Sequence, residues 1–261
     1  MHMDLATSPG SPERPNEDWT SVALPASGQG GTLVMLDGVT PPAGKDGCEH
    51  GVPWFTTHLG SALLELSASR RDLSLAEILS RAIRHTADQH RGRCDLSHVR
   101  TPQATVIVVR WGGPDGEVEH LVLSDSLLLL ESPDGTVRVI ADDRLDRIPG
   151  ERLRTDDLAD ALRNAEGGFF TAAADPSVAA RAVTGRTPVA EVRAVAALTD
   201  GAARWVEMFG EGDWADVLAL LRKEGAQGLL DRVRAIESAE PARVRGKRHD
   251  DATAALAELA P

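Results

Sequence analysis

Apolar and polar positions follow two different periods along the 261-residue chain. Short, continuous apolar runs are typical of buried β-strands, whereas apolar side chains three and four residues apart indicate amphipathic helices. Strands are expected at residues 18–24, 32–36, 104–111, 118–123, 126–131, 136–140 and 189–199. Helices are expected at residues 54–67, 75–90, 155–164, 202–209, 213–222 and 227–237. The chain therefore mixes strands and helices throughout its length.

Two of the apolar runs stop abruptly at an Asp-Gly pair, Asp37-Gly38 and Asp200-Gly201. Elsewhere, at Asp115-Gly116 and Asp134-Gly135, such a pair separates two strand-like runs, as expected of a hairpin turn. No strand follows directly after Asp37 or Asp200. Each carboxylate is therefore expected at the open end of a buried strand, where it is held rigidly and can face a ligand. We expect these two strand ends to lie side by side and to hold metal.

The connections between these segments carry further expectations. Close turn signals between residues 104 and 140 predict an antiparallel meander, and the charged segment 141–187 shows no clear strand. Ser74, with Glu77 three residues on, has the capping-box pattern of a helix start. The alternating tail that ends at Leu259 is interpreted as an edge strand. Residues 1–13 are expected to form a flexible arm and residues 14–261 a single domain.

Composition and charge limit the class of protein. The formal net charge is −12, which argues against broad nucleic-acid binding, because such binding depends on Lys and Arg neutralising phosphates. No apolar run approaches the roughly 20 residues that span a bilayer. Residues 1–16 lack the apolar core of a secretory signal. We therefore expect a cytoplasmic protein that binds neither nucleic acid nor membrane.

The two cysteines, Cys48 and Cys94, are expected to be reduced thiols of a cytosolic protein. A zinc site can be built from four side chains: Cys48, His50, Cys94 and His98. Their C-x-H and C-x₃-H spacings match no common zinc module. His85 and His90 lie five residues apart, would not share a helix face, and are interpreted as surface histidines.

Acidic residues stand at the borders of several expected strands. They are Glu17, Asp18, Asp37, Asp200, Asp250 and Asp251. Clustered oxygen ligands suit hard cations such as Mg²⁺ or Mn²⁺. Carboxylates cannot crowd together ionised without a compensating charge, so their convergence would itself argue for metal. The alternative is that these residues simply cap strands and loops of an acidic protein.

Five short motifs occur in order across residues 14–253. They are Arg14-Pro15-Asn16-Glu17-Asp18, Val34-Met35-Leu36-Asp37-Gly38, Leu123-Ser124-Asp125-Ser126, Leu198-Thr199-Asp200-Gly201 and His249-Asp250-Asp251-Ala252-Thr253. Together they resemble the motif series of the metal-dependent type 2C protein phosphatases, the PPM family. The resemblance implies an α+β fold, a four-layer αββα sandwich in which two antiparallel sheets pack face to face with helices on both outer sides.

The resemblance also implies roles for individual residues. Two Mn²⁺ or Mg²⁺ ions would be held by Glu17, Asp18 (through water), Asp37, the Gly38 carbonyl, Asp200 and Asp250. Asp37 would bridge the two ions, which would activate a shared water for in-line attack on phosphorus. Arg14 would grip the substrate phosphate, and its guanidinium fork is well shaped for that contact.

The chain departs from the family pattern at several positions. Arg14 stands one residue closer to Glu17 than the usual arginine. Val39 occupies the position at which many members have a histidine that can act as general acid. Arg204 stands where another aspartate is common, which bears on a possible third metal site through Asp125.

The function implied is a Mn²⁺- or Mg²⁺-dependent signalling phosphatase that acts on phosphoserine or phosphothreonine in a phosphoprotein substrate. Two alternatives stay open. One is a phosphatase of a small phosphorylated metabolite, and the other is a catalytically silent relative that binds a phosphoprotein. The basic loop at residues 243–248 is interpreted as solvated charge, with contact to an acidic substrate as the alternative.

Overall fold

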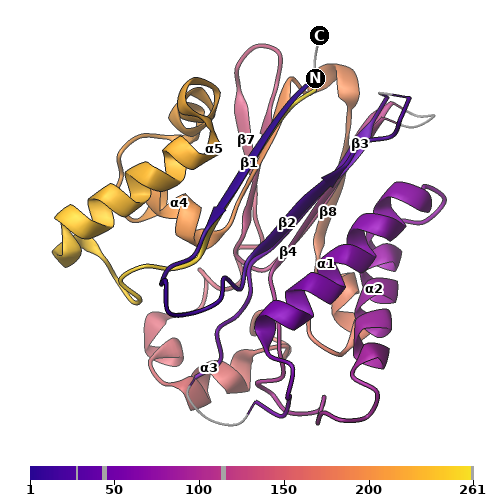
Figure 1. The fold of residues 1–261 in the computed structure, drawn as a ribbon, viewed down its shortest axis with the longest axis vertical. Helices are drawn as coiled ribbons and strands as arrows, with labels where there is room; N and C mark the ends of the chain where they lie inside the picture. Colours follow the sequence, from indigo (N-terminus) through magenta and orange to yellow (C-terminus); the bar gives the residue numbers. More distant parts are fainter. Residues whose placement is uncertain (28, 43–45, 113–115, 260–261) are drawn as a thin grey trace.

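The computed structural model describes residues 1–27, 29–42, 46–112 and 116–259, and these residues form two five-stranded antiparallel sheets (Figure 1). The first sheet has the order β1 (His2–Ser8), β10 (Ala252–Glu258), β9 (Ala194–Leu198), β6 (Leu127–Glu131) and β7 (Val137–Ile140). The second has the order β2 (Trp19–Ala23), β3 (Gly31–Leu36), β4 (Val106–Gly112), β5 (Glu117–Leu123) and β8 (Val183–Pro188).

Helices cover the outer face of each sheet. The second sheet carries α1 (Val52–Ser69) and α2 (Leu75–Gln89), and the first carries α4 (Asp200–Glu207) and α5 (Trp214–Ala239). The short helix α3 (Asp156–Leu162) lies beyond one end of the sheets (Figure 1). Short 3₁₀ helices occur at Gly150–Leu153, Pro176–Arg181, Val189–Glu191 and Pro241–Arg243. The four-layer α+β arrangement implied by the resemblance is confirmed.

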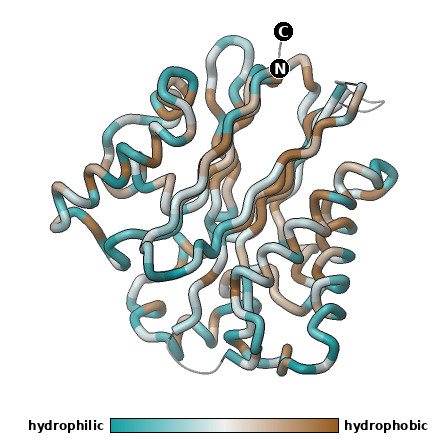
Figure 2. Tube along the Cα trace, viewed as in Figure 1, coloured by the Kyte–Doolittle hydropathy of each residue, from teal (hydrophilic) through white to brown (hydrophobic). Residues whose placement is uncertain are grey.

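Burial on both faces explains why the strands read as continuous apolar runs. In β3, Leu33 and Met35 belong to the core between the sheets, whereas Val34 and Leu36 pack in the core under the helices α1 and α2. All six residues of β3 are buried. Apolar residues accordingly follow the strands and the inner faces of the helices (Figure 2). A strand covered on both faces cannot show polar alternation.

Local signals within the helices behave as expected. The Ser74 hydroxyl accepts the Glu77 N–H, and the Glu77 carboxylate accepts the Ser74 N–H, so the capping box predicted for α2 is confirmed. The two helices expected after residue 213 are joined in α5 across a break at Gly225, where φ is +78°. The Asp4 carboxylate accepts the Ala226 N–H (2.7 Å), which gives the second part of α5 its own start.

The expected antiparallel meander is wrong, because its four strands divide between the sheets. β4 and β5 pair in one sheet, whereas β6 and β7 pair in the other. The chain crosses over at Ser124, which has φ of +71° and whose N–H donates to the Asp142 carboxylate (3.0 Å). This turn places Asp125 between the ends of the two sheets. Periodicity encodes the burial of a strand and not its pairing partner, which is why the sequence pattern missed the crossing.

Three further expectations need correction. Residues 2–8 form the edge strand β1 and not a flexible arm. The last strand, β10, is therefore interior, since β1 pairs with one of its edges and β9 with the other. The segment 141–187 contributes the start of β8, a half-exposed edge strand whose Thr, Gly and Arg residues leave no apolar run to recognise.

Candidate active site

The two Asp-Gly pairs lie at the same end of the two facing sheets. Asp37 follows β3 directly, and Asp200 opens α4 two residues after the end of β9, with Thr199 between them. Both strands are fully buried interior strands, so each carboxylate is carried on a rigid support. The charge of Asp200 raises the pKa of Asp37 more than that of any other carboxylate does, so the two side chains are neighbours. The expectation that these strand ends lie side by side is thus met in the fold.

Further carboxylates converge on this pair and raise its pKa values. Burial raises the pKa of Asp37 well above its usual range, and the charges of Asp200, Asp18, Asp125 and Asp250 raise it further. Burial, followed by the charges of Asp250 and Asp125, raises the pKa of Asp200 to about 6. Five carboxylates at the ends of both sheets therefore lie close enough together to act on one another's pKa values.

Asp18 connects the two sheets at this site. It precedes β2, and its Oδ2 accepts the hydroxyls of Thr199 (3.0 Å) and Thr253 (2.6 Å) from the opposite sheet. Its other oxygen, Oδ1, is buried and has no hydrogen-bond partner among the described residues. Burial, with the charges of Asp251 and Asp200, raises the pKa of Asp18 to about 7. An oriented carboxylate with one free oxygen is suited to accept a further partner.

Glu17 is positioned through its backbone. The Asp251 carboxylate accepts the N–H of Glu17 (2.7 Å) and the N–H of Gly10 (2.7 Å), which fixes the loop before β2. The Glu17 side chain accepts the Thr40 hydroxyl. Asp251 therefore supports the site from behind, although it does not enter the carboxylate cluster around Asp37.

The glycines of the two Asp-Gly pairs permit close packing of the neighbouring acidic segments. A Cβ on Gly38 would lie 2.5 Å from the Glu17 carbonyl oxygen, and one on Gly201 would collide with the Asp251 carbonyl. Neither glycine has positive φ. They are therefore needed for the close packing, whereas a hairpin glycine such as Gly135 is needed for its positive φ. Any larger residue would push Glu17 or Asp251 away from the site.

Two cations offset part of the negative charge. The Lys247 ammonium donates to Asp250 Oδ1 (2.9 Å) and to the Thr40 hydroxyl (3.0 Å). Arg204 donates to Asp250 Oδ2 (3.3 Å) and to the fully buried Glu237 (2.6 Å). Among the clustered carboxylates, Asp250 is thus the one that is paired with two cationic side chains.

A cavity of about 190 Å³ opens beside these residues. Its lining includes Arg14, Glu17, Thr40, Lys247 and Asp250. Burial raises the pKa of Glu17, and the positive charges of Lys247 and Arg14 act in the opposite direction. Arg14 is exposed at the rim, so the cavity combines carboxylates with two cations that face the same space.

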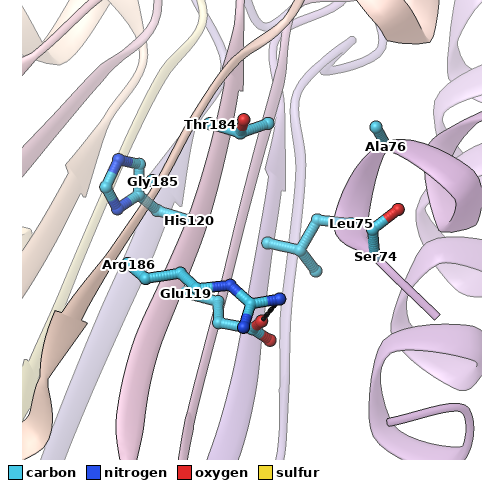
Figure 3. A pocket seen from close by; sticks show the side chains of 8 residues that line it. All are labelled: Ser74, Leu75, Ala76, Glu119, His120, Thr184, Gly185 and Arg186. Atoms are coloured by element: carbon cyan, nitrogen blue, oxygen red, sulfur yellow. Dashed lines mark ion pairs between the residues drawn. The ribbon is translucent and has the colours of Figure 1, made fainter. Parts of the chain in front are cut away.

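A second cavity, of about 250 Å³, lies between β5, β8 and the start of α2 (Figure 3). Its two charged residues, Glu119 and Arg186, pair with each other (2.9 Å), and Glu119 also pairs with the buried Arg110 behind the cavity. Burial and the charge of Arg138 lower the pKa of His120 there to about 4, which keeps the imidazole neutral. These groups do not converge on a common point as the carboxylates do, so the first cavity is the better candidate site.

The structure brings together most of the residues expected from the motifs. Glu17, Asp18, Asp37, Asp125, Asp200 and Asp250 meet at one end of the sheets, and Arg14 lies at the rim. Sequence reasoning missed Lys247, which it assigned to a solvated loop, and the oriented hydroxyls of Thr40, Thr199 and Thr253. It also missed Glu207. The pKa of this carboxyl is raised to about 7 by burial and by the charges of Asp146, Asp200 and Asp125. Thr199 and Thr253, which hold Asp18, lie inside two of the five motifs. Their place in these motifs is the feature of the sequence that could have identified them.

The donor set fits a hard divalent cation. It consists of carboxylate oxygens without thiols or imidazoles, and Mg²⁺ and Mn²⁺ prefer such ligands. The unpartnered Oδ1 of Asp18 and the raised pKa values indicate that the carboxylates lack the positive charge they would need to be fully ionised.

Comparison with known proteins agrees with this geometry. The sequence matches the family model described as protein phosphatase 2C over residues 11–233. The chain belongs to the protein phosphatase 2C family. The match spans the first four motifs, and the fifth lies beyond its end. No match was found among curated proteins.

Solved structures of phosphatase 2C folds are similar over nearly the whole chain. A bacterial serine phosphatase superposes with a TM-score of 0.61 at 15% identity, covering 100% of this chain and 98% of that one. The Mycobacterium tuberculosis serine/threonine phosphatase PstP/Ppp gives 0.60 at 16% identity, with 100% and 99% covered. RsbX in complex with magnesium gives 0.55 at 11% identity, with 99% and 94% covered. At these identities the similarity shows a shared fold. Within the described residues, no helix combines the length and apolar character needed to cross a membrane.

Proposed function

We propose that this chain is a Mn²⁺- or Mg²⁺-dependent phosphatase that hydrolyses phosphoserine and phosphothreonine in proteins. The convergence of Asp18, Asp37, Asp125, Asp200 and Asp250 carries the proposal. Like charges crowd together in a folded protein only where protons or cations offset them. Membership of the protein phosphatase 2C family supports the choice of a phosphoprotein substrate.

The bound ions would be held by residues from both sheets. One ion would take Glu17, Asp37 and the Gly38 carbonyl, with Asp18 acting through water, and the other would take Asp37, Asp200 and Asp250. When bound, the ions supply the Lewis-acid chemistry of phosphate-ester hydrolysis, activating water and offsetting phosphate charge. Asp125 is the candidate ligand for a third ion.

Residues behind these ligands orient them. The Thr199 and Thr253 hydroxyls hold one oxygen of Asp18, and the other has no hydrogen-bond partner among the described residues and can accept one. Asp251 and Thr40 hold the backbone and the side chain of Glu17 respectively. Such outer partners fix the direction of a ligand and raise its affinity for metal.

Arg14 and Lys247 provide the positive charge for the substrate. Both line the cavity, and a phosphate monoester near neutral pH is largely a dianion. Arg14 can offer its forked donors to two phosphate oxygens, whereas Lys247 offers a point charge. The substrate phosphate would therefore lie between these cations and the carboxylate cluster.

The ion pairs of Asp250 favour a second candidate function. With Lys247 and Arg204 already neutralising Asp250, the chain could bind a phosphoprotein without turnover. In that case Lys247 and Arg14, which line the cavity, would form an anion site, and divalent metal would not be needed.

The deciding experiment is hydrolysis of a chromogenic aryl phosphate with Mn²⁺ or Mg²⁺, with and without chelator. We expect metal-dependent turnover, followed by preference for phosphoserine or phosphothreonine peptides over small phosphorylated metabolites in a competition assay. Phosphopeptide binding that is unaffected by chelator and accompanied by no turnover would instead establish the silent relative.

A further inference from the structure

A second cluster of metal-ligating side chains lies outside the carboxylate site. Cys48 and His50 belong to the loop that enters α1, His90 is the residue at the end of α2, and Cys94 follows in the next loop. One ligand atom from each of the four lies within 4.8 Å of the other three. Two cysteines and two histidines thus meet where the ends of α1 and α2 come together.

Four of the six distances among the ligand atoms can be compared with those of a tetrahedral zinc site. The Cys48 sulfur lies 3.2 Å from the Cys94 sulfur and 3.5 Å from Nδ1 of both His50 and His90. The Cys94 sulfur lies 3.3 Å from His50 Nδ1. A tetrahedral zinc ion with Zn–S of about 2.3 Å and Zn–N of about 2.0–2.1 Å separates its ligand atoms by roughly 3.3–3.8 Å. The three sulfur–nitrogen distances agree with this to within about 0.3 Å, whereas the two sulfurs lie about 0.5 Å closer together than zinc would hold them.

The fourth member of this cluster is His90 and not His98, and His90 is not a surface residue. Its exposed fraction is 2%, because the helix end carries the ring inward. After it, Arg91 and Gly92 have φ of +51° and +71°, and this turn brings Cys94 back towards the cluster. His98 instead accepts the Arg100 N–H on Nδ1 (3.1 Å).

The surroundings hold the four side chains in place. The His50 ring stacks on Trp54 with centroids 4.2 Å apart, and the His90 ring meets the same Trp54 edge-on at 4.7 Å. The backbone N–H of His50 donates to the Cys48 sulfur (3.3 Å), and such a hydrogen bond stabilises a thiolate. The Gly47 carbonyl accepts the Asp95 N–H (2.8 Å) and joins the two loops. Backbone hydrogen bonds and the ring of Trp54 therefore hold the cluster in place.

The outward nitrogen of His50 also has a suitable neighbour. With Nδ1 on a metal, Nε2 carries the proton, and metal-bound histidines usually donate that proton to a carboxylate or carbonyl. The Glu49 carboxylate lies 3.8 Å from Nε2 and pairs with Arg93 (2.9 Å), whose guanidinium lies 3.0 Å from the same Nε2. Zinc binding through Nδ1 would therefore require Arg93 to turn away, so that the Nε2 proton could be donated to Glu49.

We propose that Cys48, His50, His90 and Cys94 bind one structural zinc ion. Four protein ligands complete a tetrahedral site and leave no open position for substrate, as in structural rather than catalytic zinc sites. Thiolate and imidazole ligands select zinc over the Mg²⁺ or Mn²⁺ expected at the carboxylates. The ion ties the start of α1 to the end of α2.

The zinc site supports the carboxylate site through a short connection. Val52, the first residue of α1, packs against Gly38, where an added Cβ would lie 2.5 Å from Val52 Cγ1. Loss of zinc would release the loop before α1, and with it the wall against which Asp37-Gly38 rests. We expect the main effect on stability and a smaller one on turnover.

The test is the metal content of the full chain, purified under reducing conditions and dialysed against EDTA. We expect about one zinc per chain by elemental analysis, with two thiols that react only as zinc is released. Cys48→Ser and His90→Ala should lose the zinc, whereas His98→Ala and His85→Ala should keep it. Cobalt substitution should give the charge-transfer and d–d bands of a tetrahedral S₂N₂ site, which a merely destabilised protein would not show.

Two results would overturn the proposal. One is wild-type protein that holds no zinc even after zinc is supplied during folding, with both thiols freely titratable. The other is a Cys48–Cys94 disulfide found by mass spectrometry in protein isolated without oxidant. If the variants fail to fold, thiol titration and cobalt spectra of the wild-type protein still decide between these outcomes.

Discussion

The carboxylate site and the Cys/His cluster sit at neighbouring loops but gather different atoms in different ways. The first collects oxygens from strand ends of both sheets, carried by residues as distant in sequence as Asp18 and Asp250. The second collects sulfur and nitrogen from two loops of one helical layer. Among the described residues, only the second brings three or more ligand atoms within 4.8 Å of one another. The carboxylates therefore stand farther apart.

Charge explains this difference. Ionised carboxylates repel one another, and burial makes the repulsion stronger, so without an ion they separate or hold protons. Neutral thiols and imidazoles can touch without such a penalty. A cluster of the first kind destabilises the fold until metal arrives and can exchange its ions, whereas one of the second kind can remain assembled. The molecule thus has its expected catalytic site at the carboxylates and a separate site, the Cys/His cluster, that is expected to stabilise the fold.

The largest expected effects contrast one ligand from each site. Asp37→Asn should lower Mn²⁺-dependent kcat/KM by more than the roughly 10- to 100-fold that loss of an outer-shell partner costs. The metal-free variant should be as stable as the wild type or more so, because one repelling charge is gone. Cys48→Ser should instead lower the melting temperature by about 5 °C or more, and turnover less.

Kinetics and thermal unfolding of both variants check this contrast. Asp134→Asn, in an exposed hairpin turn, is the matched control and should change neither quantity. Full turnover in Asp37→Asn would refute its assignment as a metal ligand. A Cys48→Ser protein as stable as the wild type would remove the contrast between the sites.

Within the carboxylate site, Arg14 separates substrate binding from metal binding. Arg14→Ala should lower kcat/KM by roughly 10- to 100-fold, since hydrogen bonds to charged groups contribute about 1.5–3 kcal/mol. Metal affinity should stay nearly unchanged, and Arg14→Lys should restore only part of the loss. Steady-state kinetics together with Mn²⁺ titration measure both quantities. Unchanged kinetics would mean that another cation, such as Lys247, holds the phosphate.

The pH dependence of stability should distinguish the carboxylate site from the rest of the molecule. The pKa of Asp200 is raised from 3.8 to about 6, so the folded state prefers its protonated form. The stabilisation from this group is complete below about pH 4 and is lost as pH rises through 6. At about 1.4 kcal/mol per pKa unit, the change is on the order of 1–3 kcal/mol.

Unfolding of metal-free wild type and Asp200→Asn between pH 5 and pH 8 tests this sign. The variant should be the more stable protein at pH 8, and the difference should shrink towards pH 5. Added Mn²⁺ should reverse the order at pH 8, because it stabilises only the protein that binds it. A variant that is less stable at pH 8 without metal would contradict the raised pKa.

The smallest expected effect concerns Lys247, whose ammonium competes with metal for Asp250. Its side chain is 49% exposed, and exposed ion pairs contribute about 0.2–1 kcal/mol. Lys247→Met should therefore raise Mn²⁺ affinity by about 1.5- to 5-fold. Lys223→Met, on an exposed part of α5, is the control and should leave affinity unchanged. Weaker Mn²⁺ binding in Lys247→Met would show that the lysine supports the metal site.

The local pattern of the sequence determined the elements and their chemistry. The apolar runs that end at Asp37 and Asp200 predicted buried strands, because a continuous apolar run leaves no polar face for solvent. The ordered motifs around Glu17 and Asp250 indicated the family, and the capping signal at Ser74 fixed the start of α2. Each of these features depends on neighbours within a few residues, which a sequence records directly.

Only the tertiary structure decided which elements become partners. The positive φ of Ser124 sends the chain from one sheet to the other, and the pairing of β1 turns the last strand into an interior one. The turn at Arg91 and Gly92 directs Cys94 towards His90, so His90, and not the His98 considered from the sequence, is the fourth member of the cluster. A single backbone dihedral angle changes the direction of the chain after it. The pattern of apolar and polar residues does not encode that angle directly.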